Sequence, residues 1–469
     1  MKRSIKLYVL LGVLIVACVV TVLVTRRQEK KEEIKASGEV VLTVPADNVT
    51  AIRWDYGGET LSFHRGDGWT YDADAAFPVD ESKLTKLFNV FESFAAAFTI
   101  ENVEDYGQYG LDQPICTIDV TTETSTVQMK LGDYSKLDSQ RYVSVGDGKV
   151  YLAKSDPLDV FDATLSDLIR HDEIPAMDTV TEICFSGAED YTVTRVEDDS
   201  TLSPCADDVY FADLSSQPLA LDSYAVESWL SAVESLSPTD YVTYNATDEE
   251  LASFGMDAPE LTATVTYTAE SADEAAEPEQ ITLYVSRNRE ELAAAEASED
   301  GDTSTVTAYV RIGQSPIVYR VTQYKYSSLM SMTRDELRHQ TLWTADLAQA
   351  TGMEVRLEGE AYSFISETNE DGERIWHYGE QEIDLEAVSS TLKALTAERF
   401  VTETPEQKAE IGLTISLENE SFPQIELTLY RYDGADCLAQ VNGATVSLIP
   451  RAQVVNLIEA VNAIVLNGT

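Results

Sequence analysis

A helix-start pattern occurs three times in this chain, and it constrains the fold more than any other feature of the sequence. In each copy an apolar residue precedes an Asp, and a second apolar residue follows four positions after that Asp. The Asp suits the N-cap of a helix, because its carboxylate accepts a free backbone N–H and favours the positive end of the helix dipole. The apolar pair forms a hydrophobic staple. The three copies are Val79-Asp80 with Leu84, Leu221-Asp222 with Val226, and Ile383-Asp384 with Val388. They predict a chain built from three related modules.

Each predicted start leads into an amphipathic helix. Apolar residues recur at helical spacing after each Asp, which indicates that one face of each helix packs against a core. These residues are Leu84, Leu87, Phe88, Phe91, Phe94 and Ala95 in the first helix, Val226, Trp229, Leu230, Val233 and Leu236 in the second, and Leu385, Val388, Leu392 and Leu395 in the third.

A glycine between apolar residues follows each predicted helix. Gly110, Gly255 and Gly412 lie 30, 33 and 28 residues after Asp80, Asp222 and Asp384, respectively. We expect a tight backbone approach or a positive φ at each glycine, where the chain passes from the helical layer to the following strands.

Strand-like stretches with alternating apolar and polar residues surround these landmarks. Val49–Trp54, Val180–Phe185 and Met353–Leu357 open the three modules, and further strands follow each glycine. The alternation indicates antiparallel sheets with one buried face. The predicted fold class is therefore α+β, an N-terminal transmembrane helix followed by repeated modules of antiparallel strands with one amphipathic helix each. The predicted segments are an anchor (1–27), a tether (28–46), module 1 (47–172), module 2 with an acidic insertion (173–341) and module 3 (342–469).

The N-terminus predicts a single membrane span. Leu7 to Val24 is a charge-free, mostly apolar run with basic residues on both sides. Its length corresponds to ~27 Å of helix, roughly the hydrocarbon thickness of a bilayer. The apolar run continues directly into Arg26 and Arg27, which favours an uncleaved anchor over a signal peptide. Ile15-Val16-Ala17-Cys18 also resembles a bacterial lipobox, so lipidation of Cys18 is the alternative.

The predicted location is the cell membrane, with one pass and the large domain outside the cytoplasm. More basic residues follow the span than precede it, which argues for the opposite orientation. Long domains, however, translocate largely regardless of charge, and a short basic tail is the usual start of an exported chain.

The charge balance limits the partners of the chain. There are 33 Lys and Arg against 82 Asp and Glu, a formal net charge of −49. Such a surface repels phosphate backbones, so we expect no nucleic-acid binding. Cations, basic proteins and neutral ligands stay open as partners.

Several polar groups have two interpretations. His171 and His339 end two similar segments, 166–171 and 334–339, and are interpreted as sharing one register. They indicate either a pH-sensitive or metal-touching interface, or helix C-termini inherited with the repeat. Cys184 and Cys205 either pair in an oxidising compartment or stay isolated thiols.

Acidic segments in the second and third modules are interpreted as solvated loops. The tracts 270–280 and 287–305 are rich in Ala, Glu, Asp and Ser, which is typical of solvated segments. Asp300-Gly301-Asp302 and Glu370-Asp371-Gly372-Glu373 could bind Ca²⁺ weakly, but neither matches the twelve-residue calcium loop.

The sequence contains none of the common catalytic motifs. It has no nucleophile elbow, P-loop, zinc-protease helix or dinucleotide-binding fingerprint. We therefore expect a non-enzymatic protein without a cofactor.

Three short motifs resemble a known bacterial family. Trp69 in a turn, Phe77-Pro78-Val79-Asp80 before a helix, and the segment Tyr109 to Pro114 look like the family called domain of unknown function 4340. The likeness covers most of residues 47–340 and is weaker in the third module, where no Pro follows Gly412-Leu413. The family's members are typically single-span envelope proteins, often encoded near ABC-type transporter components.

The resemblance implies an accessory or scaffold subunit of an ABC-type transport or surface-assembly system. Its expected partners are the membrane, through the N-terminal helix, and ABC transporter subunits or other envelope proteins. The alternative function is an extracytoplasmic binding module for a wall polymer or a cation. The resemblance supplies no catalytic residue and no ligand.

Overall fold

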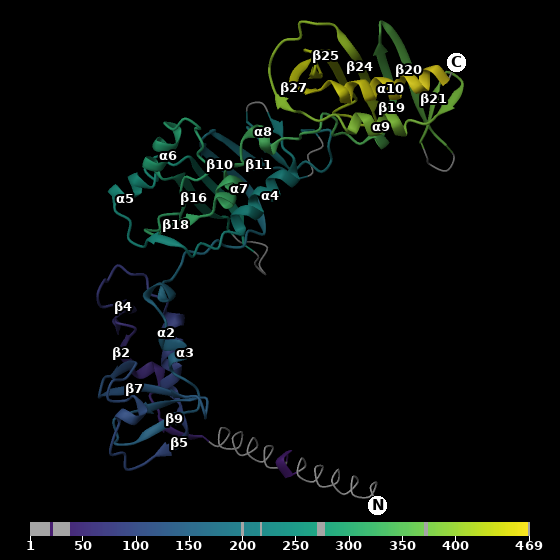
Figure 1. Cartoon of the computed structure of the whole chain (residues 1–469). Coiled ribbons are helices and arrows are strands. Elements are labelled where there is room, and N and C mark those ends of the chain that lie inside the picture. The colour runs from purple at the N-terminus through teal and green to yellow at the C-terminus, as the bar shows by residue number, and fades with distance from the viewer. Residues whose placement is uncertain are drawn as a thin grey trace, which may run out of the picture. The chain divides into compact units, whose positions relative to one another are not determined.

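The computed structural model describes residues 19–21, 38–197, 201–215, 218–269, 277–369 and 374–467 (Figure 1). The chain divides into two compact units, Met1–His171 and Asp172–Thr469. Among the described residues, no helix combines the length and apolar character needed to cross a membrane. The predicted anchor lies outside the described residues, apart from residues 19–21.

The first unit contains one nine-stranded sheet with the order β1-β5-β9-β8-β7-β6-β2-β3-β4. Its strands are β1 Glu39–Leu42, β2 Val49–Tyr56, β3 Glu59–Arg65, β4 Trp69–Tyr71, β5 Phe94–Ile100, β6 Cys116–Thr122, β7 Thr126–Ser135, β8 Gln140–Ser144 and β9 Val150–Ala153.

The second unit contains two further nine-stranded sheets. The orders are β13-β12-β11-β10-β15-β16-β17-β18-β14 and β22-β21-β20-β19-β24-β25-β26-β27-β23. The strands of the first of these are β10 Thr179–Gly187, β11 Tyr191–Arg195, β12 Tyr210–Ala212, β13 Leu219–Ala220, β14 Tyr241–Thr243, β15 Leu261–Thr268, β16 Glu279–Arg287, β17 Ala308–Ile312 and β18 Val318–Val321. Those of the other are β19 Ala350–Leu357, β20 Glu360–Thr368, β21 Arg374–Tyr378, β22 Gln381–Ile383, β23 Arg399–Phe400, β24 Ala409–Leu417, β25 Gln424–Arg431, β26 Asp436–Val441 and β27 Ala444–Pro450.

Helices connect the strands and follow the last strand of each sheet. The α-helices are α2 Glu81–Glu92, α3 Leu158–Phe161, α4 Ser223–Glu234, α5 Asp248–Ser253, α6 Arg289–Glu296, α7 Gln323–Met330, α8 Arg334–Leu337, α9 Glu386–Lys393 and α10 Arg451–Asn467. The 3₁₀ helices are η1 Ala46–Asn48, η2 Gly107–Tyr109, η3 Leu165–Leu168 and η4 Leu347–Gln349.

The three sheets repeat one topology. From β4 to β5, from β12 to β14 and from β21 to β23, eight strands follow one another in the same order, and all their pairings are antiparallel. The helices α2, α4 and α9 leave each sheet at equivalent points of this order. The predicted α+β repeat of antiparallel sheets is therefore confirmed.

Alternation along the strands builds the cores. In β15 the side chains of Leu261, Ala263, Val265 and Tyr267 are buried, while those between them are half-buried. The buried residues pack in one cluster with those of α4, because strand side chains with a period of two all point to the helix-covered face. Figure 1 shows α9 and α10 across one face of the third sheet in the same way.

Three details of the secondary structure differ from the expectations. Residues 39–42, assigned to the tether, form β1 and pair with β5, because an edge strand can add to the sheet beside Ala95 and Ala96. Phe94 begins β5, since α2 already ends at Glu92. The C-terminal helix α10 was not predicted.

The acidic insertion is also not a loop throughout. Arg289–Glu296 forms α6, whose first turn is capped by the side chain of Asn288. Three consecutive alanines favour this helix, and Arg289 pairs with Asp257 at 2.6 Å. Residues 270–276 and the acidic turn at 370–373 lie outside the described residues.

Candidate binding groove between helices α4 and α7

The three Asp residues predicted as N-caps lie at equivalent points of the repeat, but only the first two are the N-caps of their helices. Asp80 is the N-cap of α2 and accepts the backbone N–H groups of Ser82 and Lys83 at 3.0 and 3.3 Å. Asp222 is the N-cap of α4 and accepts the N–H of Tyr224 at 3.0 Å.

The third copy departs from the prediction. Asp384 accepts the N–H of Glu386 at 2.8 Å, but the N-cap of α9 is Leu385, so this helix starts one residue later than predicted. Asp384 is exposed, which leaves its carboxylate in competition with water.

Two of the three landmark glycines have the expected backbone. Gly110 and Gly255 have φ values of +67° and +76°, in the left-handed region that favours glycine. A Cβ on Gly110 would lie 2.7 Å from the side chain of Asp133, and one on Gly255 would lie 2.3 Å from Ser286 Oγ. Both glycines are therefore needed for a close approach of the preceding turn to the sheet.

The expectation for Gly412 is wrong. Gly412 lies inside strand β24, and the nearest atom to a Cβ there, Thr428 Oγ1, is 3.8 Å away. Its neighbours Ile411 and Leu413 are buried on the core face of the strand. The apolar–Gly–apolar pattern arises here from strand alternation, not from a turn.

In the first two modules, a repeated seam joins the start of the helix to the segment after the last strand. The N–H of Asp80 donates to Leu168 O at 2.8 Å, and the N–H of Asp222 donates to Leu337 O at 2.9 Å. Both seam segments begin with a capping box, at Thr164 and at Thr333. The seams are thus equivalent with an offset of 169 residues.

This offset corrects the interpretation of the histidines. His171 corresponds to Gln340, and His339 corresponds to Arg170, so the two histidines are one residue out of register. The sequence alignment matched Asp167 with Asp335, whereas the N3 acids of the two capping boxes are Asp167 and Glu336.

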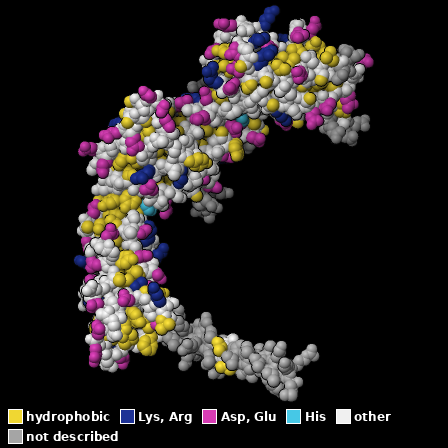
Figure 2. Space-filling model, viewed as in Figure 1, with side chains coloured by type: hydrophobic (Ala, Val, Ile, Leu, Met, Phe, Trp, Pro, Cys, Tyr) yellow, Lys and Arg dark blue, Asp and Glu magenta, His cyan; other side chains and the backbone are white. Residues whose placement is uncertain are grey.

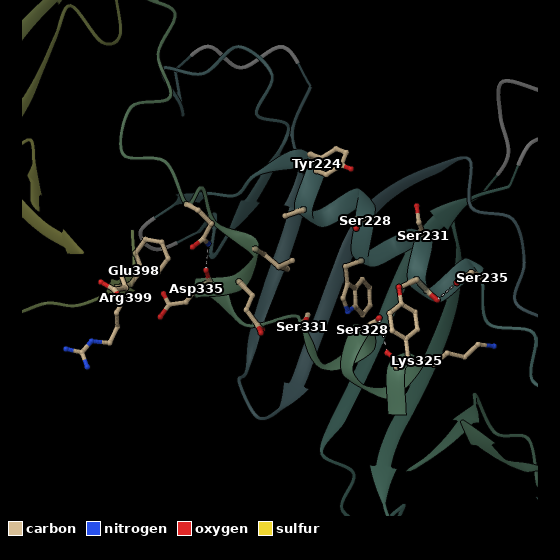
Figure 3. A pocket seen from close by; sticks show the side chains of 18 residues that line it. Tyr224, Ser228, Ser231, Ser235, Lys325, Ser328, Ser331, Asp335, Glu398 and Arg399 are labelled. Atoms are coloured by element: carbon tan, nitrogen blue, oxygen red, sulfur yellow. Dashed lines mark hydrogen bonds between the residues drawn. The ribbon is translucent and has the colours of Figure 1, made fainter. Parts of the chain in front are cut away.

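One groove of the second unit runs between α4, α7 and α8. Its volume is about 940 Å³. Figure 3 shows Ser228 and Ser231 on α4 with Ser235 just after it, and Ser328 on α7 with Ser331 just after it. Small side chains keep the floor low, and their hydroxyls present both donors and acceptors. The other lining residues are Tyr224, Ala225, Trp229, Ala232, Tyr324, Lys325, Asp335, Glu336, Leu337, Gln340, Glu398, Arg399 and Phe400.

Two tyrosines line the groove with their side chains in solvent. Tyr224 is the second residue of α4 and is 80% exposed, and Tyr324 is the second residue of α7 and is 81% exposed. The hydroxyl of an exposed Tyr stays in solvent, and its ring offers a large flat apolar face. Such side chains are favoured at binding surfaces because only two torsions must be ordered.

The floor of the groove is fixed from below by Trp229. Its ring is 3% exposed, packs edge-on against Phe185 with centroids 4.9 Å apart, and donates its N–H to Leu329 O at 2.9 Å. This carbonyl lies in the last turn of α7, where no backbone N–H of the helix can reach it. The bond therefore sets the distance between the two helices that carry the tyrosines.

A second support lies beneath α7. The hydroxyl of Tyr326 donates to Glu260, which also pairs with Arg287 at 3.0 Å. The guanidinium carbon of Arg287 lies 5.1 Å from the centre of the Tyr326 ring. Burial, and then the hydrogen bond and charge of Glu260, raise the pKa of Tyr326, so the hydroxyl stays a donor. Helix α7 is thus anchored to Glu260, just before β15, and through this carboxylate to Arg287 at the end of β16.

The far rim of the groove carries both charge signs. Arg338 stacks on Phe400, with its guanidinium carbon 4.0 Å from the ring centre, and burial lowers the pKa of this arginine. Glu398 and Arg399 are exposed beside Phe400. A partner with mixed charges can therefore be matched at the rim.

Acidic side chains are spread over the visible face of both units (Figure 2). This distribution agrees with the net charge of −49.

The four described cysteines have free thiols. The Cys184 thiol contacts Glu182 and Thr192 in its own sheet, and the thiol of Cys205 lies by Asp208. Pairing of Cys184 with Cys205 is therefore not part of this structure.

The fold thus defines a repeated α+β protein with an open groove in its second unit. The model of the family described as Domain of unknown function (DUF4340) matches residues 69–210 and 214–414, and the chain belongs to this family. No curated protein and no solved structure matches the chain.

Proposed function

We propose that this chain is a non-enzymatic, membrane-anchored envelope protein that holds a partner protein in the groove between α4 and α7. In this proposal the chain is an accessory or scaffold subunit of an ABC-type transport or surface-assembly system. The transport setting comes from the family resemblance, and the binding role comes from the groove.

The observation that carries the binding role is the pair of solvent-facing tyrosines on a supported helix pair. Tyr224 and Tyr324 stand on helices whose spacing is set by the Trp229 bond, so their backbones lose little freedom when a partner binds. Tyr and Arg are the residue types that most often dominate protein interfaces. The groove combines both types with a rim of mixed charge at Glu398 and Arg399.

The predicted anchor would add to this binding without adding contacts. A tether at the N-terminus raises the local concentration of the groove near partners in the same membrane. A weak groove affinity then suffices for stable association, and release of the domain from the membrane should abolish its role.

The hydroxyl-lined floor favours one alternative ligand, a neutral wall polymer. A sugar ring can stack on an exposed tyrosine face, and the hydroxyls of Ser228, Ser231 and Ser331 can bond its polar edge. The partner protein is favoured because of the charges of both signs at the rim, which a neutral glycan does not need.

Retention of partners from solubilised membranes tests the proposal. Tyr224→Ala and Tyr324→Ala should each weaken retention of a specific membrane protein about tenfold, as interface tyrosines do. Tyr134→Ala is the matched control, because Tyr134 is a 46% exposed tyrosine in the other unit. Retention of wall glycan with the same dependence on the two tyrosines would favour the alternative. Unchanged retention of the partner by both alanine variants would refute the groove as the binding site.

A further inference from the structure

We propose that Cys205, Asp208 and His339 form a Zn²⁺ site in the second module. The three side chains come from two segments far apart in the sequence, the loop between β11 and β12 and the residue just after α8 and its cap. This inference is independent of the groove and of its partner.

The three donor atoms already lie together. Cys205 Sγ, a carboxylate oxygen of Asp208 and a ring nitrogen of His339 lie within 4.8 Å of one another. His339 Nε2 is 2.7 Å from Asp208 Oδ1. The side chain of Asp208 is 1% exposed, whereas that of His339 is 20% exposed. The cluster is thus embedded on the carboxylate side and reachable from solvent on the imidazole side.

The donor types select zinc. Thiolate, imidazole and carboxylate are the usual protein ligands of Zn²⁺, whereas Ca²⁺ and Mg²⁺ take oxygen ligands. Three protein ligands leave a fourth tetrahedral position for water. Tetrahedral ligands at zinc distances lie about 3.4 Å apart, so the contact between His339 and Asp208 must open by less than 1 Å.

Two outer groups lie beside the proposed ligands. Asp222 Oδ2 lies 3.9 Å from His339 Nδ1, the nitrogen that would face away from the metal. A carboxylate on the distal nitrogen is the usual outer partner of a zinc-bound histidine. The hydroxyl of Ser203 donates to Asp208 Oδ2 at 2.6 Å and leaves Oδ1 for the metal.

The first module lacks these ligands. The loop before β12 spans residues 196–209, whereas the equivalent loop before β4 spans only 66–68. This longer loop supplies Cys205 and Asp208. The position of His339 is held by Arg170 in the first module, which cannot bind a metal. The longer loop and the histidine, two differences from the first module, thus lie at the same place in the structure. Stability of the repeat alone does not require this coincidence.

Metal binding would fix the longer loop against the start of α4. The loop already touches this helix, because the hydroxyl of Ser223 donates to Asp207 O at 2.9 Å. Burial raises the pKa of the Cys205 thiol to about 11, so Zn²⁺ must displace a proton from the thiol when it binds.

Titration of the full chain with Co²⁺, followed by competition with Zn²⁺, tests the site. The wild type should bind one Co²⁺ with a sulfur-to-metal charge-transfer band and the visible bands of tetrahedral cobalt, and Zn²⁺ should abolish both. Cys205→Ser should remove the charge-transfer band. His339→Gln should weaken Zn²⁺ binding at least tenfold. Asp222→Asn keeps an N-cap side chain and should weaken binding about 10–100-fold, as loss of an outer carboxylate does.

Cys184→Ser is the matched control, because Cys184 is another half-buried thiol of the same module. Its spectrum should equal that of the wild type. Circular dichroism of the metal-free variants should show that each one is folded. If Cys205→Ser does not fold, Cys205→Ala takes its place. An unchanged charge-transfer band in the folded Cys205 variant, or the absence of specific Co²⁺ binding by the wild type, would overturn the proposal.

Discussion

The indole N–H of Trp229 donates to the carbonyl oxygen of Leu329 at 2.9 Å, and this single bond joins helices α4 and α7. The two helices carry the exposed tyrosines of the groove. The bond therefore links the packing of the second core to the geometry of the proposed binding surface.

Trp229→Phe should lower both stability and partner retention. The variant keeps an aromatic ring but removes the donor, and it leaves a buried carbonyl unpaired at a cost of about 1–3 kcal/mol. Urea unfolding of the chain measures the stability, and the membrane pull-down measures the retention. Trp376→Phe, a half-buried change in the third sheet, should leave retention unchanged. Equal retention by the Trp229 variant would show that the helix spacing does not matter for binding.

Gly255→Ala and Gly412→Ala should have different effects. At Gly255 a Cβ meets Ser286 Oγ at 2.3 Å on a backbone with φ of +76°, so Ala should cost about 1–3 kcal/mol. At Gly412 the nearest atom is 3.8 Å away in an ordinary strand, so Ala should be close to neutral. Thermal unfolding compares the two. A larger loss at Gly412 would restore the original alignment of the third glycine.

Asp80 should stabilise the first module more strongly at neutral than at acid pH. Burial opposes ionisation of Asp80, but hydrogen bonds from Ser82 and Lys83 and the charge of Lys83 together lower its pKa below the ordinary 3.8. A group with a lowered folded pKa contributes its full stability above the unfolded pKa and loses it as the pH falls through the folded pKa.

Two variants separate the cap from the charge. Asp80→Ala should cost about 0.5–2 kcal/mol at pH 7, because the first turn of α2 loses its acceptor. Asp80→Asn keeps an acceptor without a titrating charge, so its stability should fall less than that of the wild type as the pH drops below 3.8. Urea unfolding across that range measures both, and parallel curves for the wild type and Asp80→Asn would exclude the charge as the cause.

The sequence predicted the repeat because its signals are local. Asp80 and Asp222 cap their own helices, and the alternation in strands such as β15 is visible within eight residues. The same local reasoning failed at Gly412, where two buried strand residues around a glycine imitate a turn. Only the pairing of β24 with β19, seen in three dimensions, separates the two meanings.

The sequence singled out His339 as one of two histidines with a possible metal-touching role, but the partners at the candidate sites could not be predicted, since they depend on contacts between distant segments. Trp229 meets Leu329 across 100 residues, and His339 meets Asp208 across 131. The seam offset that separates His171 from His339 rests on backbone hydrogen bonds, which residue identities do not reveal. A signal did exist in the sequence: the segment that holds Cys205 is longer than its counterpart in the first module.

The most direct test of the proposed binding function is site-specific photo-crosslinking from the groove in intact membranes. A photoreactive amino acid at Ser231, an exposed position on the α4 side of the groove, should crosslink to one membrane protein, and Tyr324→Ala should reduce that product. The same amino acid at Glu227, exposed on α4 but outside the groove lining, should give little of the product. No protein product from Ser231, or equal products from both positions, would contradict the account.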